Sequence, residues 1–187
     1  MGHISVEYDA GGIKGLHIIT PEKHGDERGF FMETYNEADM RQAGIDYTFV
    51  QDNQSKSAKG VLRGMHYQIS HPQAKLVRAI RGSIFDAVID LREDSATYGR
   101  WYAAVLSEDN CRQLLVPEGF AHGFLVLSDV AEVCYKCNDF YHPDDEGGII
   151  WNDPDVGIKW PKLDDGTPLT ISEKDKSWRR LCAGTDK

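Results

Sequence analysis

The sequence has few cysteines and no long hydrophobic run. Four cysteines, Cys111, Cys134, Cys137 and Cys182, are too few for a disulfide framework in a chain of 187 residues, which is long enough to bury its own core. We expect all four to be reduced thiols. No segment approaches the ~18 consecutive apolar residues of a membrane span, and the N-terminal sequence lacks the basic and apolar regions of a signal peptide. A cytoplasmic protein is therefore predicted.

The chain also lacks an excess of basic residues. Its 21 lysines and arginines are outnumbered by 30 aspartates and glutamates, which gives a formal net charge of −9 at pH 7. A protein of this sign is repelled by polyanions unless its cations are locally concentrated, so nucleic acid is not an expected partner. No repeat, low-complexity run or linker divides the sequence, and we expect residues 1–187 to form one domain.

Short apolar segments dominate the pattern, and long helical periodicity is nearly absent. They recur roughly every 8 to 15 residues with glycine-containing turns between them, which is typical of an all-β sandwich or barrel. We favour a jelly roll, because its two sheets can close around a ligand cavity. Two short helices are expected, at 36–43 capped by Asn36 and at 172–178 capped by Ser172. The predicted strands are 13–20, 47–51, 61–68, 75–81, 84–91, 101–106, 112–116, 122–127, 131–137 and 148–151.

Two polar residues share predicted strand faces with apolar or small side chains. His66, in segment 61–68, is either a functional histidine or a hydrogen-bonded core residue. Asp86 is in phase with the apolar residues of 83–90, and a buried carboxylate needs a partner. If Asp86 accepts a hydrogen bond from His66 or His122, the other nitrogen of that ring becomes a better base. Otherwise Asp86 satisfies a backbone donor or an arginine.

Two other predicted strands carry further candidates for chemistry. Segment 75–81 has Lys75 and Arg81 in one phase and Arg78 in the other, so one of its faces is unusually cationic. Such cations suit an anionic ligand or an enolate in a cleft, or else they lie on a solvated outer face. Tyr135, in a later strand, is either a proton donor or a large amphipathic core residue.

The cysteines and histidines do not have the pattern of a metal site. Cys134 and Cys137 have the spacing of a zinc or redox pair, but residues three apart on a strand face opposite sides. No second cysteine pair exists to complete a zinc site. His66 has no second histidine two residues away, and the other histidines are far apart in sequence. We therefore expect no metal.

Seven motifs follow one another along the chain. They are GDERGFFMETYN (25–36), FVQDNQSKS (49–57), LRGMHYQ (62–68), KLVR (75–78), LVPEGFAHGF (115–124), AEVCYKC (131–137) and EGGIIWNDPDVGIKWP (146–161). Together they resemble the dTDP-4-dehydrorhamnose 3,5-epimerase family over nearly the whole chain, with residues 1–12 as an N-terminal extension. The resemblance implies a cupin-like double-stranded β-helix, or jelly roll, with short peripheral helices. It also implies a homodimeric isomerase that needs no cofactor.

The resemblance further implies roles for individual residues. His66 would be the catalytic base, with Asp86 as its carboxylate partner. Tyr135 would be the proton donor and Lys75 the cation that stabilises the enolate, while Asp175 would lie near the reacting sugar. The substrate-contacting positions would be Arg28, Glu33, Gln51, Asp52, Asn53, Arg63, His122, Glu146, Lys174 and Tyr141, the last stacking on the thymine.

The implied substrate is dTDP-4-dehydro-6-deoxy-D-glucose, which is converted on the route to dTDP-L-rhamnose. Its C4 ketone acidifies the hydrogens on C3 and C5, so a base can remove one if a positive donor meets the enolate oxygen. Competing hypotheses are an epimerase of C3 or C5 alone and a 3,4-ketoisomerase. A non-catalytic sugar-nucleotide-binding protein and a metal-dependent cupin oxygenase are two others.

One implied residue conflicts with a regular strand. Strict alternation places Arg63 and His66 on opposite faces, although the resemblance assigns both to the substrate. A bulge beside Gly64 would bring them to the same side. Otherwise Arg63 acts at the rim of the cleft or through the partner subunit.

Overall fold

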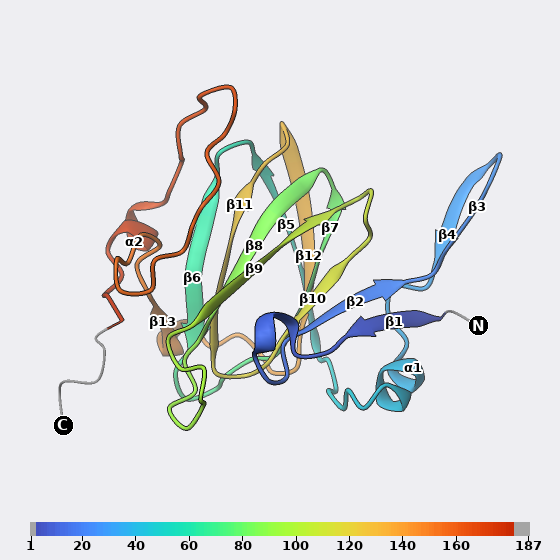
Figure 1. Cartoon of the computed structure of the whole chain (residues 1–187), viewed down its shortest axis with the longest axis horizontal. Helices are drawn as coiled ribbons and strands as arrows, with labels where there is room; N and C mark the ends of the chain where they lie inside the picture. Colours follow the sequence, from blue (N-terminus) through green and yellow to red (C-terminus); the bar gives the residue numbers. More distant parts are fainter. Residues whose placement is uncertain (1–2, 182–187) are drawn as a thin grey trace.

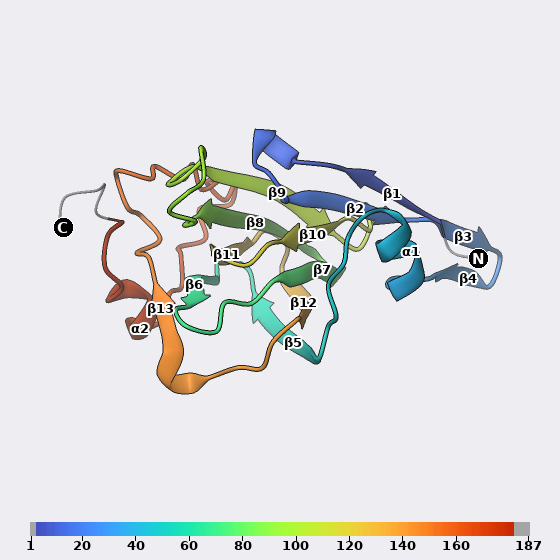
Figure 2. The same ribbon diagram turned by 90° about the horizontal axis from the view of Figure 1, so that it is seen from below.

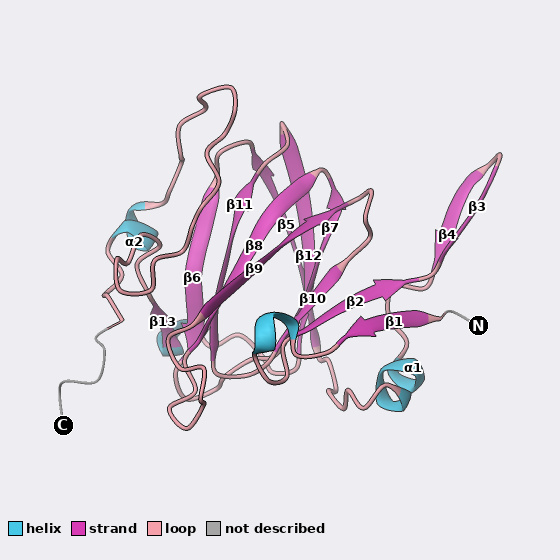
Figure 3. Ribbon diagram, in the orientation of Figure 1, coloured by secondary structure: helices cyan, strands magenta, loops and turns pink. Residues whose placement is uncertain are grey.

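A computed structural model describes residues 3–181, which form two antiparallel sheets packed against each other (Figures 1 and 3). The six-stranded sheet has the order β1 (Ile4–Glu7), β2 (His17–Pro21), β10 (Gln113–Val116), β7 (Lys75–Arg81), β12 (Val130–Cys137) and β5 (Gln51–Ala58). The five-stranded sheet has the order β13 (Glu146–Gly148), β6 (Leu62–Gln68), β11 (Phe120–Val126), β8 (Ser83–Asp90) and β9 (Trp101–Ser107). The predicted all-β jelly roll is confirmed.

The helices are short and peripheral, as predicted. Helix α1 (Glu37–Gln42) is capped by the Asn36 side chain, and α2 (Glu173–Lys176) by the Ser172 hydroxyl, which accepts a hydrogen bond from the backbone N–H of Asp175. Two single 3-10 turns complete the set, η1 (Ala10–Gly12) and η2 (Pro143–Asp145). Within residues 3–181, no helix combines the length and the apolar character needed to cross a bilayer. The cytoplasmic location stays a prediction.

The apolar core lies between the two sheets. Alternation along each strand sends every second side chain inward. The inward residues at the centre of the core include Val77, Ala79, Ile84, Val88, Leu114, Phe124 and Val133. Toward one side of the sandwich the inward positions become polar, with Asn53, Lys75 and Tyr135 on the six-stranded sheet. A packed core therefore gives way to a cavity.

Three parts of the β structure were missed or misplaced by the sequence pattern. Strand β1 was not predicted, and neither was the hairpin of β3 (Lys23–Asp26) and β4 (Gly29–Met32), which projects away from the sheets in both views (Figures 1 and 2). Strand β5 was predicted at 47–51 but forms at 51–58, where QDNQSKSA contains no aromatic or β-branched residue. Pairing with β12 over its full length stabilises β5, and a pattern of apolar residues cannot reveal such pairing.

Strand β6 contains a bulge, which was one of the alternatives for Arg63. His66 lies opposite His122, and Arg63 lies opposite Phe124, so three steps along β6 correspond to two along β11. Arg63 and His66 consequently line the same cavity. Gly64 is required at the irregularity, because its φ is +123° and an added Cβ would lie 2.6 Å from the Cα of Gly123.

Candidate active site

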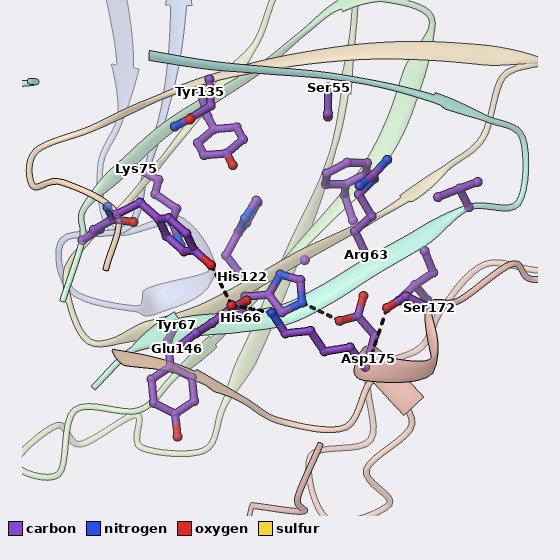
Figure 4. A pocket seen from close by; sticks show the side chains of 18 of the residues that line it. Ser55, Arg63, His66, Tyr67, Lys75, His122, Tyr135, Glu146, Ser172 and Asp175 are labelled. Atoms are coloured by element: carbon purple, nitrogen blue, oxygen red, sulfur yellow. Dashed lines mark hydrogen bonds and ion pairs between the residues drawn. The ribbon is translucent and has the colours of Figure 1, made fainter. Parts of the chain in front are cut away.

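A cavity of about 720 Å³ lies between the two sheets (Figure 4). Its walls come from both sheets, and the segment that contains α2 closes one side. Most of the predicted site residues line it. They are Gln51, Asn53, Arg63, His66, Lys75, His122, Tyr135, Tyr141, Glu146, Lys174 and Asp175.

His66 is paired with Asp175, so the predicted pairing of His66 with Asp86 is wrong. The Nε2 of His66 is 2.6 Å from Oδ1 of Asp175, although 109 residues separate them (Figure 4). Oδ2 of Asp175 accepts a hydrogen bond from the backbone N–H of Gly64 at 3.3 Å. Burial acts to raise the pKa of Asp175, but hydrogen bonds from His66, Gly64 and Trp178 hold it below its ordinary value. The pair joins a charged carboxylate to the imidazole.

Asp86 instead binds His122. Its Oδ1 is 2.7 Å from His122 Nε2, and both residues are buried. The register explains this pairing, because Phe124 lies opposite Asp86 and His122 is therefore its diagonal neighbour on the same face. The prediction that Asp86 points inward is confirmed by its 0% exposure. Its Oδ2 has no hydrogen-bond partner within the described part of the chain.

Lys75 and Tyr135 belong to the six-stranded sheet, so they line the wall across the cavity from His66. Burial lowers the pKa of Lys75 despite the nearby negative charges of Glu146 and Asp86. Burial also raises the pKa of Tyr135, which keeps its hydroxyl protonated at neutral pH. The cavity thus has the His66–Asp175 pair on one wall, and Lys75 and the protonated Tyr135 on the other.

The predicted cationic strand contributes a single cation to the cavity. Lys75 is on the inner face of β7, whereas Arg78 lies on the outer face and lines a separate pocket there. Arg81, at the end of β7, is exposed. Alternation places Arg78 on the face of β7 opposite to Lys75. Among the inward positions of β7, only the first, Lys75, lies beside the cavity, and Arg81 lies at the other end of the strand.

A cluster of polar residues forms the rim of the cavity. The Tyr141 hydroxyl donates to Oε2 of Glu146 at 3.0 Å, and Lys174 forms an ion pair with the same oxygen. Burial acts to raise the pKa of Glu146, but the bonds from Lys174 and Tyr141 lower it overall. Glu146 is therefore a charged anchor that holds Tyr141 and Lys174 at the mouth.

Three predicted substrate residues do not line the cavity of their own chain. Arg28 is on the projecting hairpin, and Glu33 follows it and accepts a hydrogen bond from Asn36. Asp52 points to the outer face of β5, where Lys136 donates to it at 2.7 Å. Alternation places Asp52 on the face opposite to Gln51 and Asn53, so adjacency in a motif did not mean a shared site.

Other cavity residues were missed by the sequence reasoning. They include Ser55, Tyr67, Gln68, Gln73 and Phe124. The Ser55 hydroxyl is buried and has no hydrogen-bond partner in the described chain. Alternation from Gln51 and Asn53 would have predicted it, had β5 been placed correctly.

The cysteines have the predicted geometry. Cys137 is buried beside Lys75, whereas Cys134 lines the pocket on the outer face of the same sheet, so the two do not form a pair. Cys111, Cys134 and Cys137 are free thiols, and Cys182 lies outside the described residues. No cluster of three His, Cys, Asp or Glu residues suited to a metal ion occurs within residues 3–181. The absence of metal and cofactor stays a prediction.

Comparison with known proteins gives consistent matches. The model of the dTDP-4-dehydrorhamnose 3,5-epimerase family matches residues 11–183. A dTDP-4-dehydrorhamnose 3,5-epimerase from Methanothermobacter thermautotrophicus is 55% identical over 169 residues, 90% of this chain and 91% of the relative. A dTDP-6-deoxy-D-glucose-3,5-epimerase from Legionella pneumophila, in complex with dTDP-4-keto-L-rhamnose, has a TM-score of 0.90 at 45% identity and covers 95% of this chain and 93% of its own.

A more distant solved structure has a narrower activity. It is a 3′-monoepimerase from Streptomyces bikiniensis in complex with dTDP-quinovose. Its TM-score is 0.81 at 36% identity, with coverage of 89% of this chain and 84% of its own. The same fold therefore serves relatives that differ in how many centres they invert.

The jelly roll, its histidine-containing cavity and these relatives define an isomerase with a cupin-like fold. The chain belongs to the dTDP-4-dehydrorhamnose 3,5-epimerase family. The predicted family and enzyme class are confirmed, and the roles of individual residues stay predictions.

Proposed function

We propose that the protein inverts C3 and C5 of dTDP-4-dehydro-6-deoxy-D-glucose, giving dTDP-4-dehydro-L-rhamnose for dTDP-L-rhamnose synthesis. The observation that carries this proposal is the placement of His66 with Asp175 on one wall of the cavity and of Lys75 and Tyr135 on the other. Inversion at carbon requires a proton to leave from one face and another to arrive at the opposite face. Two walls with complementary groups are suited to this task.

His66 is the proposed base. Its Nε2 donates to the charged Asp175, which leaves Nδ1 as the nitrogen available to accept a proton. Removal of the hydrogen from C3 or C5 sends the electron pair of the C–H bond toward the C4 ketone, which becomes an enolate. Asp175 then stabilises the imidazolium that forms.

Lys75 is the proposed stabiliser of the enolate oxygen. It is 9% exposed, so water screens its charge weakly. The lowered pKa of the Lys75 ammonium makes its proton easier to share with an oxyanion. His122, held by Asp86, lines the same cavity and contacts the substrate in this proposal.

Tyr135 is the proposed proton donor. Its hydroxyl is protonated because burial raises its pKa, and it lies on the wall across from His66. Transfer of this proton to the carbanion carbon completes the inversion and restores the ketone. The electrons stay within the sugar, so the reaction is redox-neutral.

The nucleotide occupies the rim in this proposal. Arg63, whose Nε donates to Ser57 at 3.1 Å, holds the diphosphate, because a guanidinium pairs well with phosphate oxygens. Tyr141 is 50% exposed beside Glu146 and stacks on the thymine. Local cations thus bind the anionic ligand although the protein as a whole is negative.

We also propose a homodimer. The β3–β4 hairpin projects away from the sheets (Figure 2). Its residues Phe30 and Phe31 are 59% and 69% exposed. Phe30 and Phe31 are consecutive in β4, so each face of the hairpin presents an exposed ring that a partner could bury. Arg28 lies on the same hairpin, away from the cavity of its own chain. A second copy of the chain would cover the phenylalanines and receive Arg28 at its own cavity.

Proton NMR in deuterated buffer tests the proposed function. Purified protein treated with a chelator is incubated with dTDP-4-dehydro-6-deoxy-D-glucose, and the H3 and H5 signals are followed. We expect both signals to disappear as solvent deuterium replaces the two hydrogens, with the product in the L-rhamno configuration. If the H3 and H5 signals disappeared only after a metal ion was added, the cofactor-independent mechanism would be overturned.

The same experiment distinguishes a second candidate function. The likeness to a 3′-monoepimerase makes inversion at one centre the specific alternative. Loss of H3 or H5 alone would identify a single-centre epimerase, and movement of the ketone would identify a ketoisomerase. Binding without any exchange would identify a non-catalytic sugar-nucleotide-binding protein.

A further inference from the structure

Asp175 receives hydrogen bonds from three donors. Its Oδ1 is 2.6 Å from Nε2 of His66 and 3.3 Å from the indole Nε1 of Trp178, while Oδ2 accepts from the backbone of Gly64. Asp175 is only 4% exposed, so these donors take the place of water around its charge. The proposed reaction does not use Trp178.

Trp178 is held tightly in place beside the pair. An added Cβ at Gly148 would lie 2.2 Å from Cδ2 of the indole, so the ring occupies the space that a side chain at 148 would need. Gly148 pairs with His66 across β13 and β6. The imidazole and indole rings meet edge to face, with centroids 6.2 Å apart. The direction of the indole N–H is therefore fixed by packing against the strand that neighbours the base.

We propose that Trp178 is a positioning residue, whose indole N–H holds the Asp175 carboxylate in place and shares its Oδ1 with His66. This inference rests on the proposed function, because it gives Trp178 a part in the work of the His66–Asp175 pair. Trp178 itself transfers no proton and acts through Asp175.

The shared oxygen has an electrostatic consequence. Burial acts to raise the pKa of Asp175, and the three donors counteract it. Without the indole N–H, the buried Asp175 carboxylate keeps its negative charge but has one hydrogen-bond donor fewer. The His66–Asp175 pair then takes up a proton at a higher pH. A protonated pair cannot remove a hydrogen from the sugar, so the acid side of the activity profile moves to higher pH.

Other titratable and charged groups face His66 from the elements packed around it. They are Arg63 and Tyr67 on β6, Lys75 on β7, His122 on β11 with Asp86 behind it on β8, Tyr135 on β12, Glu146 on β13, Lys174 on α2, and Tyr141 at the rim. A substitution at Trp178 alters the charge of none of them. Lys174 lies 5.6 Å above the indole ring, and an aromatic replacement keeps a ring beneath it.

The test compares kcat and KM between about pH 5 and pH 9 for wild type and Trp178→Phe. Phenylalanine keeps an aromatic ring against Gly148 and lacks the N–H. We expect kcat to fall by about 3- to 30-fold, KM to change by less than about twofold, and the acid-side midpoint to rise by roughly 0.5 to 1 pH unit. The matched control is Trp160→Phe. It removes an indole hydrogen bond to the backbone carbonyl of Trp151, in an apolar cluster away from the cavity. We expect the pH profile of this variant to match that of wild type.

A second replacement separates the hydrogen bond from the packing. The amino acid 3-benzothienylalanine at position 178 keeps the bicyclic shape and has sulfur in place of the N–H. We expect the same upward shift as in Trp178→Phe. An acid limb that stays at the wild-type pH in both variants would overturn the inference, because a packing role lowers kcat equally at every pH.

A measurement without turnover keeps the inference separate from the proposed function. Proton uptake by the His66–Asp175 pair is followed through the ring carbon signals of His66 in labelled protein, assigned with His66→Asn. The signals should change at higher pH in both Trp178 variants and at the wild-type pH in Trp160→Phe. Unmoved signals contradict the inference even if the enzyme is active. Absence of H3 and H5 exchange in wild type contradicts the proposed function alone.

Discussion

Two histidine–carboxylate pairs of the same chemistry lie at the cavity, and their positions separate their roles. His66 and His122 are opposite each other on β6 and β11. Asp175 reaches His66 from α2, whereas Asp86 reaches His122 from within the sheet. The first carboxylate orients the proposed base, and the second fixes the ring of a proposed substrate contact.

This difference predicts unequal effects of two matched substitutions. Asp175→Asn removes the charge that stabilises an imidazolium at His66, and kcat should fall by about 10²- to 10⁴-fold. Asp86→Asn keeps an oxygen that can accept a hydrogen bond from His122, which is a proposed substrate contact and not the base, so the fall should be about tenfold or less. Steady-state kinetics of the two purified variants measures both values of kcat and tests this order. The reverse order of effects would mean that Asp86 serves the base.

Tyr135 should affect inversion more than proton abstraction. Tyr135→Phe removes the proposed donor and leaves His66 and Lys75 in place. We expect product formation to fall by about 10²-fold or more, with solvent exchange at the abstracted position falling much less. Deuterium incorporation and product configuration are measured by NMR in the same sample. Equal losses of both would assign Tyr135 a structural role only.

At the scale of elements, the connection from β8 to β9 is organised by one buried carboxylate. Asp90, at the end of β8, accepts hydrogen bonds from Arg92, Ser95 and Thr97. Burial acts to raise its pKa, but these bonds lower it to about 2. The turn is thereby fixed beside the outer strand β9.

This network predicts a stability that depends on pH. The depressed pKa of Asp90 stabilises the folded state fully above the unfolded-state value near 3.8, and this contribution is lost as pH falls toward 2. Asp90→Asn should lower the free energy of unfolding by about 2 kcal/mol at pH 7 and by little near pH 2. Urea unfolding at several pH values measures this. Asp94→Asn, an exposed change in the same turn, is the control, and equal losses at both pH values in Asp90→Asn would contradict the argument.

At the scale of the whole molecule, the proposed dimer makes each cavity depend on two chains. Arg28→Ala and His66→Ala should each remove most activity. When the two variants are mixed, dissociated and reassembled, some dimers contain one chain of each. In such a dimer, one of the two cavities has an intact His66 and receives an intact Arg28 from the partner chain. Random assembly then restores about one quarter of wild-type activity. Sedimentation establishes the oligomeric state, and a monomer at micromolar concentration or no restoration would contradict this arrangement.

Much of the fold was predictable because it rests on local signals. Apolar segments between turns predicted most strands, and Asn36 and Ser172 predicted both helix starts. A bulge beside Gly64 was one of the alternatives that the family resemblance left open for Arg63, and the register of β6 and β11 confirms it. Strand β5 was misplaced, because neighbouring hydrogen bonds stabilise it in the absence of apolar side chains of its own.

The sequence by itself determined the all-β class, the family and the inward direction of His66, Asp86 and Tyr135, because alternation and motifs are properties of short segments. Only the tertiary structure decided which carboxylate serves which histidine. Asp175 reaches His66 across 109 residues from a helix outside the sheets, and strand register gives Asp86 to His122. Pairing of this kind depends on how distant segments pack, and no local pattern contains that information.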